Sequence, residues 1–210
     1  MKSRKLLTAG TVALLALNLV SCGTEDEAAS SSSSLSGSWL SDCYSEVEDG
    51  ETKYVRDKIV FTTTVFAREM QEFSDSACAT GTSTYAISGT ITVGDEVTTP
   101  SGATALDLAM TAVAQMTLMA DTHVTYFNEQ NVCGGGWEKD TAKSVSAAGC
   151  TDDTGKDFTS MLGKTWYSIY KIEDDTLSIG VESGAQDGKT EATRETSFNT
   201  NTLTKQASNT

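Results

Sequence analysis

Two long stretches of this chain alternate apolar and polar residues, and this alternation restricts the folds that the chain can adopt. In Thr84 to Val97, one face carries Tyr85, Ile87, Gly89, Ile91 and Val93, and the other carries Ser88, Thr90 and Thr92. Successive side chains of a β-strand point to opposite faces of the sheet, whereas a helical pattern repeats roughly every 3.6 residues. The stretch therefore predicts a long strand with one face in water.

The second stretch, Thr104 to Leu118, has the same period but is rich in residues that favour helices. Its apolar residues fall on even positions: Leu106, Leu108, Met110, Ala112, Ala114, Met116 and Leu118. Alanine, leucine and methionine have high helix propensity, so a helix is the alternative. Because the alternation continues through the whole stretch, we expect a second long strand.

The rest of the chain carries further strand signals between glycine and aspartate turns. Threonine, valine, isoleucine and aromatic residues favour strands over 37–45, 57–73, 165–172, 177–181 and 197–204, and one strand with a turn over 137–149. Within 57–73, Val65 and Ala67 continue the phase of Ile59 and Phe61. Asp121 to Gln130 is the one predicted helix. About eight antiparallel strands can form a sandwich or close into a barrel, and closure removes exposed edges.

The N-terminus has the features of an export signal. Three positive charges in residues 1–5 precede an uncharged, mostly apolar stretch from Leu6 to Val20, shorter than the roughly 20 residues that span a bilayer. Leu19-Val20-Ser21-Cys22 resembles the lipobox of bacterial lipoproteins, which implies a diacylglycerol group on Cys22 and cleavage after Ser21. The alternatives are an ordinary secretory signal with a chance cysteine and an uncleaved anchor helix.

These features divide the chain into three parts. Residues 1–21 are the predicted signal peptide, residues 22–36 are an acidic and serine-rich tether, and residues 37–210 are a single domain. We expect the protein in the bacterial cell envelope, held to a membrane by lipid on Cys22. Gly23 is not the aspartate associated with inner-membrane retention in enteric bacteria, so the outer membrane is expected if the organism has one.

The net charge of −14 excludes nucleic acid as a partner, because phosphate backbones bind basic surfaces. Four cysteines remain besides Cys22: Cys43, Cys78, Cys133 and Cys150. In an exported protein they indicate two disulfides, with three possible pairings. A zinc site is the rival, but the chain has no Cys-x-x-Cys pair and a single histidine, His123. Nearest-neighbour pairing, which closes the shortest loops, joins Cys43 to Cys78 and Cys133 to Cys150.

Gly37-Ser38-Trp39 resembles the Gly-x-Trp signature of lipocalins. Together with Cys43 and with Phe73-Ser74-Asp75-Ser76-Ala77-Cys78, it is similar to a lipocalin-like group of small bacterial lipoproteins. It is more faintly similar to the lipid-binding extracellular domains of the adenomatosis-polyposis-coli-down-regulated Wnt inhibitors. The resemblance implies an eight-stranded antiparallel barrel closed at one end by Trp39, and it also links Cys43 to Cys78. Arg194 is the candidate for the late arginine that packs on this tryptophan in lipocalins.

The sequence shows little catalytic chemistry. His123 has no recognisable partner, and the pairs Asp152-Asp153 and Asp174-Asp175 are typical of turns. Residues 152–157 lack the acid spacing of a calcium loop, and Gly134 to Gly136 lack the lysine of a phosphate cradle. We therefore expect neither an enzyme nor a bound metal or cofactor.

Two functions from different classes remain. The first is a binding module, in which the barrel holds a small apolar or amphipathic ligand against Leu106, Leu108, Met110, Ala112 and Ala114. The second is a structural or interaction lipoprotein with a filled barrel that contacts another envelope protein or a host protein. The interior of the barrel separates them, because an eight-stranded barrel is either filled by its own side chains or holds one small ligand.

Overall fold

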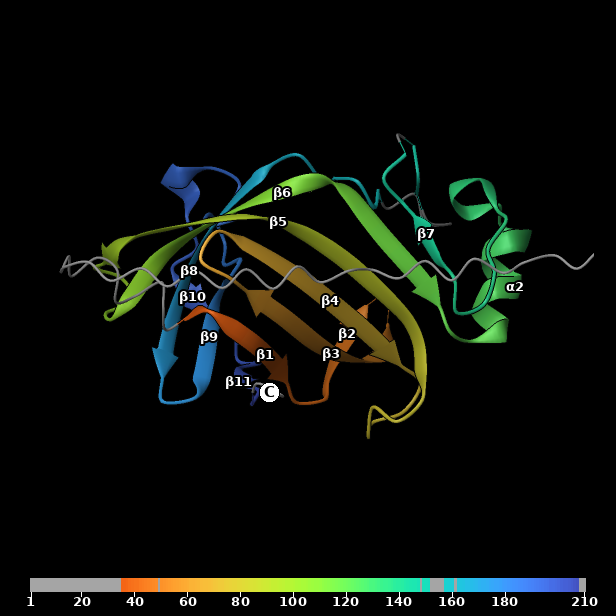
Figure 1. Ribbon diagram of the computed structural model, residues 1–210, viewed down its shortest axis with the longest axis horizontal. Helices are drawn as coiled ribbons and strands as arrows, with labels where there is room; N and C mark the ends of the chain where they lie inside the picture. The colour runs from red at the N-terminus through yellow and green to blue at the C-terminus, as the bar shows by residue number, and fades with distance from the viewer. Residues whose placement is uncertain (1–34, 49, 148, 152–156, 161, 208–210) are drawn as a thin grey trace, which may run out of the picture.

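The computed structural model describes residues 35–48, 50–147, 149–151, 157–160 and 162–207 (Figure 1). The predicted signal peptide, Cys22 and most of the tether lie outside the described residues, as do Asp152 and Asp153. Of the helices that are described, none is both long enough and apolar enough to cross a membrane.

Eleven strands and one α-helix make up the described fold. The strands are β1 (Gly37–Ser41), β2 (Tyr44–Glu48), β3 (Glu51–Phe61), β4 (Val65–Phe73), β5 (Gly81–Val97), β6 (Ala103–Leu118), β7 (Ala142–Ser144), β8 (Thr165–Glu173), β9 (Thr176–Val181), β10 (Ser197–Phe198) and β11 (Leu203–Lys205). The helix is α2 (Asp121–Glu129), and two short 3₁₀ turns are η1 (Val132–Gly134) and η2 (Glu191–Thr193).

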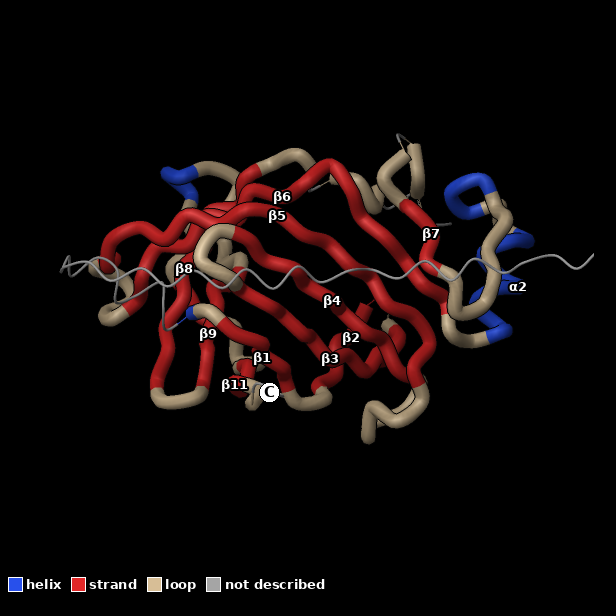
Figure 2. Tube along the Cα trace, in the orientation of Figure 1, coloured by secondary structure: helices blue, strands red, loops and turns tan. Residues whose placement is uncertain are grey.

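The strands close into an irregular antiparallel ring (Figures 1 and 2). Eight of them form it in the order β1-β11-β9-β8-β6-β5-β4-β3, and β1 pairs with β3 to close it. β2 extends the sheet beyond β3, β7 pairs with β6, and β10 pairs with β9. The predicted all-β, barrel-like fold with one short helix is confirmed, and closure leaves few free edges.

The two alternating stretches form the long hairpin β5–β6, which confirms both predicted strands. The pairing is interrupted by a bulge, because Ile87 pairs with Ala114 whereas Gly89 pairs with Met110. Residues 111–113 of β6 are therefore extra residues opposite Ser88, and Ala112 is exposed. The prediction that Ala112 lines the interior is wrong, because alternation along one strand does not reveal where that strand bulges.

Residues 57–73 form a hairpin, with the turn over residues 62–64. Phe61 pairs with Phe66, so Phe66 faces the interior and Ala67 faces outward, contrary to the expected continuous phase. The predicted strand over 137–149 is reduced to β7, and the surrounding residues form a cap over the end of β6.

The main core fills one part of the ring around Trp39, which is fully buried. The indole Nε1 of Trp39 donates a hydrogen bond to Leu35 O (2.8 Å), and Lys205 Nζ lies 5.1 Å from the centre of a ring of Trp39. A lysine from β11 therefore takes the place expected for Arg194, which lies over Tyr167 instead. A cation over an indole face is attractive, and this one closes the contact between β1 and β11.

A second core cluster forms under the cap, which consists of the described residues within 121–147, 149–151 and 157–160 together with Leu162. Trp137, Val132 and Val145 from the cap pack against Ala114 and Leu118 of β6. Two disulfides fix this architecture: Cys43–Cys78, with Cα atoms 5.8 Å apart, and Cys133–Cys150, with Cα atoms 4.4 Å apart. Both pairings are those predicted, and the second one lies within the cap.

Candidate functional site

A pocket of about 520 Å³ opens where β8 leaves β6. The last ladder pair joins Ala109 to Thr165; beyond it Met110 N donates to Lys164 O (2.9 Å) and Gly163 N donates to Thr111 O (3.3 Å). The separation coincides with the bulge in β6. The described residues that line the pocket are Met110, Ser160, Lys164, Thr165, Trp166, Tyr167 and Lys189.

Trp166 forms the aromatic wall of the pocket. It pairs with Leu108 on β6, and its ring packs against the main core. The backbone of Gly188 also lies against the indole: a Cβ atom on this glycine would be 2.8 Å from Trp166 Nε1. Gly188 also has a positive φ of 65°, so two requirements restrict this position to glycine. Gly188 O accepts a hydrogen bond from Tyr167 N (2.8 Å), which joins the segment to β8.

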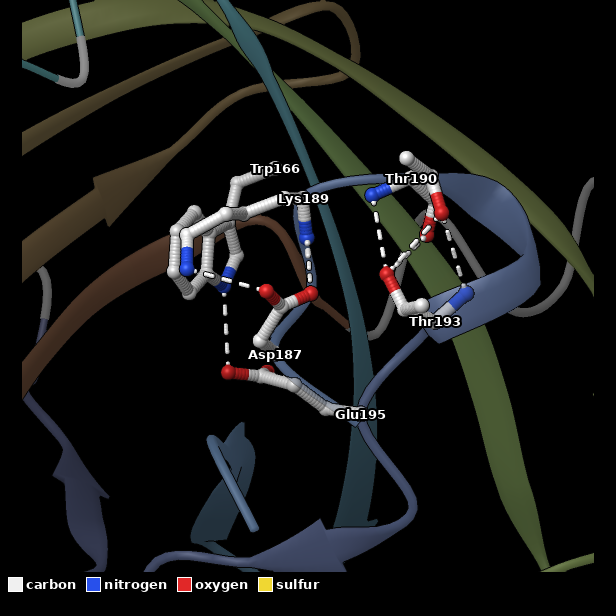
Figure 3. Close-up of polar contacts among 6 residues, drawn as sticks. All are labelled: Trp166, Asp187, Lys189, Thr190, Thr193 and Glu195. Atoms are coloured by element: carbon white, nitrogen blue, oxygen red, sulfur yellow. Dashed lines mark hydrogen bonds and ion pairs between the residues drawn. The ribbon is translucent and has the colours of Figure 1, made fainter. Parts of the chain in front are cut away.

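Glu195 lies behind this wall, with 3% of its surface exposed. Trp166 Nε1 donates to its Oε1 (3.1 Å), and Ser168 Oγ donates to its Oε2 (2.5 Å), as Figure 3 shows for Trp166. Burial raises the pKa of Glu195, the hydrogen bonds from Ser168 and Trp166 oppose this rise, and repulsion from Glu182 adds to it. A carboxyl group is thus held in the wall of the barrel by neutral donors.

The position of Glu195 follows from the way in which β8 and β9 separate. These strands pair only over Tyr170–Glu173 and Thr176–Ile179, and then β9 pairs with β10 instead. The free edge of β8 binds the segment 188–195 through two backbone hydrogen bonds: Tyr167 N donates to Gly188 O, and Glu195 N donates to Tyr167 O (3.2 Å). The carboxyl group of Glu195 enters the gap between the two strands.

Lys164 and Lys189 are the charged side chains among the described lining residues. Lys189 Nζ donates to Asp187 Oδ2 (2.9 Å), and this bond is the main cause that lowers the pKa of Asp187 to about 2. Lys164 Nζ donates to Ser160 O. The pocket lining therefore combines the thioether of Met110 and the aromatic rings of Trp166 and Tyr167 with the ammonium groups of two lysines. Figure 3 shows Lys189 and its bond to Asp187 beside Trp166.

Arg194, next to Glu195, points to the other side of the segment. Its Nη1 atom lies 2.7 Å from Asp107 Oδ1 and donates to Ser168 O (2.8 Å), and its guanidinium lies 5.4 Å from the ring centre of Tyr167. Arg194 thus connects β6 and β8 across their outer surface, and its charge is paired with Asp107 rather than with Glu195.

Only one of the five predicted lining residues reaches the pocket. Met110 lines it, Leu106 is fully buried in the main core with Leu108 packed against that core, Ala114 belongs to the second cluster, and Ala112 is exposed. The residues that sequence reasoning missed, Lys189 and Glu195 above all, lie in a polar connection without periodicity. Gly188 is the one signal there, and a single glycine does not identify a pocket.

The inner face of the ring also carries an ion pair that the sequence did not predict. Arg68 donates from Nε and Nη2 to Asp57 (2.9 and 3.1 Å), and Tyr44 Oη donates to the same carboxylate (2.7 Å). Arg68 pairs across the sheet with Ile59, which belongs to the main core, so this triad faces inward. Burial, followed by the charge of Asp57, raises the pKa of Tyr44.

The remaining candidates stay separate from this site. His123 lies on α2, and Asp174 and Asp175 form the turn between β8 and β9. A smaller pocket of about 310 Å³ lies beside the Cys133–Cys150 disulfide. Within the part of the chain that the structure describes, no cluster of three or more histidine, cysteine, aspartate or glutamate residues could hold a metal ion.

Comparison of the chain with protein-family models and with curated proteins finds no match.

Proposed function

We propose that this protein is a non-enzymatic binding module of the bacterial envelope that takes a small apolar or amphipathic ligand. The observation that carries the proposal is the pocket between β6 and β8. Its volume of about 520 Å³ falls within the range of about 300–1,000 Å³ that is typical of small-molecule sites. Met110, Trp166 and Tyr167 offer an apolar and aromatic surface, and the two lysines offer polar contacts at the rim.

The anchor belongs to the same proposal. Lipid on Cys22, followed by the acidic and serine-rich segment of residues 22–36, would hold the domain at a membrane surface, where amphipathic molecules are concentrated. The resemblance of the Gly37-Ser38-Trp39 strand and its cysteines to lipocalin-like lipoproteins supports a ligand-binding role. This support is by analogy of sequence, since a shared fold does not by itself define a function.

Binding of the neutral fluorescent dye prodan tests the proposal. We expect saturable binding to the domain, and at least about tenfold weaker binding to Thr165→Phe, whose added ring would occupy the pocket. Thr63→Phe, in the exposed turn before β4, is the matched control and should bind like the wild type. If the wild-type domain shows no saturable binding of prodan, the proposal is refuted.

A second candidate function is supported by the filled core. Trp39, Phe61, Phe66, Leu106 and Tyr170 are all buried together in the ring, so the ligand would lie in the barrel wall rather than at the centre. A filled ring is also what an interaction lipoprotein needs, because its outer face contacts a partner protein. Absence of prodan binding, together with an unchanged fold, would favour this function.

A further inference from the structure

The carboxyl group of Glu195 joins the two walls of the pocket. One wall is Trp166 on β8, whose indole N–H donates to Oε1. The other wall is Lys189, which belongs to the same segment as Glu195 (Figure 3) and follows Gly188, whose backbone lies against the indole. The segment 188–195 is attached to β8 at both ends, through Gly188 O and Glu195 N. A change at Glu195 therefore alters the relative position of two pocket walls.

The surroundings of Glu195 favour its neutral form. Trp166 and Ser168, which donate to it, are uncharged, and Gly180 of β9 contributes no side chain. Of the cationic groups on its own segment, Arg194 is paired with Asp107 of β6, and Lys189 is paired with Asp187; Glu191, also on this segment, carries the same sign of charge as an ionised Glu195. Glu182, which follows β9, repels a negative charge on Glu195. A buried carboxylate without a cationic partner is costly, so such groups tend to keep their proton.

The contacts of Ser168 are compatible with a proton on Glu195. Ser168 Oγ lies 2.5 Å from Glu195 Oε2 and 3.4 Å from Ile169 O, but a hydroxyl has one hydrogen and cannot donate to both. If Glu195 carries the proton, Oε2–H donates to Ser168 Oγ, and the serine hydroxyl is free to donate to Ile169 O. Glu195 Oε1 still accepts from Trp166. All three contacts are then satisfied at once.

Resting on the proposed binding function, we propose that Glu195 is a positioning residue that acts in its protonated form. Neutral Glu195 can stay in the dry gap between β8 and β9, where it links Trp166 to the Lys189 segment. A carboxylate accepts hydrogen bonds more strongly, but its charge is costly to bury and draws water into the gap, and this hydration loosens the wall. The affinity for a neutral ligand therefore falls as the pH rises. Because the pKa of Glu195 is raised, the loss begins above the ordinary titration range of a glutamate. By linkage, binding of a neutral ligand takes up protons.

The affinity of the wild-type domain for prodan, measured from mildly acidic to mildly alkaline pH, tests this inference. Prodan has no group that titrates in this range. We expect affinity to fall with rising pH by up to about tenfold per pH unit, the limit for uptake of one proton. Trp39 and Trp137 are buried and donate to backbone carbonyls, so a parallel change in tryptophan emission reports on Trp166.

Two variants separate positioning from general structure. Glu195→Gln replaces the protonated acid with a neutral amide, so its affinity should stay at the acidic wild-type level at every pH. Glu72→Gln is the matched control, because Glu72 also accepts from a serine hydroxyl (Ser83, 3.0 Å) but is not in the pocket wall, so it should keep the wild-type pH profile. A flat or inverted wild-type profile, or a profile that survives in Glu195→Gln, would overturn the inference while leaving the binding function intact. Failure of prodan to bind at any pH would instead overturn the binding function itself.

Discussion

Gly180 on β9 and Glu195 on the segment before β10 share one space between two strands. A Cβ atom on Gly180 would lie 2.7 Å from Ser168 Oγ and closer still to Glu195 Oε2. The carboxyl group can enter the barrel wall only because β9 has no side chain at this position. Since β8 and β9 have already separated there, the glycine and the glutamate together determine how the wall is filled.

This relationship predicts that Gly180→Ala displaces Glu195. We expect a loss of about 1–3 kcal/mol in unfolding free energy, as for overpacking of a buried site, together with a change in Trp166 fluorescence. Urea unfolding measures the first quantity. Gly94→Ala is the control, because its Cβ would meet Ala105 Cβ at 3.1 Å, which a small shift relieves, and Ala105 O at an ordinary 3.9 Å. Equal losses of unfolding free energy in the two variants would show that the contact with Glu195 does not contribute to the loss in Gly180→Ala.

The pH dependence of stability gives a second prediction for Glu195. Its pKa is raised in the folded state, so the folded state binds the proton more tightly than the unfolded state does. The stability contributed by this group is therefore fully present below the ordinary pKa of a glutamate and is lost as the pH rises through the raised value. Glu195→Gln should remove this component, and thermal unfolding at a series of pH values measures it. The expectation fails if the difference between variant and wild type does not change with pH.

The inward-facing triad of Tyr44, Asp57 and Arg68 gives a third prediction. Asp57→Ala leaves the Arg68 guanidinium and the Tyr44 hydroxyl without their acceptor, and unsatisfied buried groups of this kind cost about 1–3 kcal/mol each. The side chain of Arg68 is 40% exposed, so water compensates part of this cost and the lower half of the range is expected. A double-mutant cycle of Asp57→Ala with Tyr44→Phe, followed by urea unfolding, should show coupling. Asp95→Ala, at an exposed position of β5, should have almost no effect.

The period-two pattern predicted the framework of this fold because that pattern depends on local geometry alone. It placed the strands of the β5–β6 hairpin, and nearest-neighbour spacing predicted both disulfides. It could not reveal the bulge that exposes Ala112, because a bulge preserves the alternation on both sides. The burial of Glu195 could not be predicted from the sequence for a different reason. It depends on the separation of β8 from β9, which is a feature of the tertiary structure and has no local sequence signal.

The anchor proposal is tested by Cys22→Ser. Lipidation attaches acyl chains to the cysteine sulfur, so the variant should incorporate no radioactive palmitate and should leave the membrane fraction after export. Wild-type protein expressed in parallel provides the reference for labelling and fractionation. Membrane retention of the variant equal to that of the wild type would show that another element anchors the chain.

The cap over the end of β6 depends on the Cys133–Cys150 disulfide for part of its stability. The bond closes a loop with a sequence separation of 17 residues, which in the chain-entropy model contributes about 3 kcal/mol. Besides the disulfide, Trp137 Nε1 donates to Val132 O (2.8 Å), and Tyr85 Oη donates to Phe158 O (3.1 Å). Cys133→Ser with Cys150→Ser should therefore loosen the cap before the ring opens. Hydrogen exchange should show faster exchange in residues 121–147, while the β3–β4 amides stay protected.

Cys43→Ser with Cys78→Ser is the contrasting pair, because that bond joins the loop after β1 to the loop between β4 and β5. Its loss should weaken protection of β3 and β4 first. Identical exchange patterns in the two double variants would mean that the cap and the ring unfold as one unit.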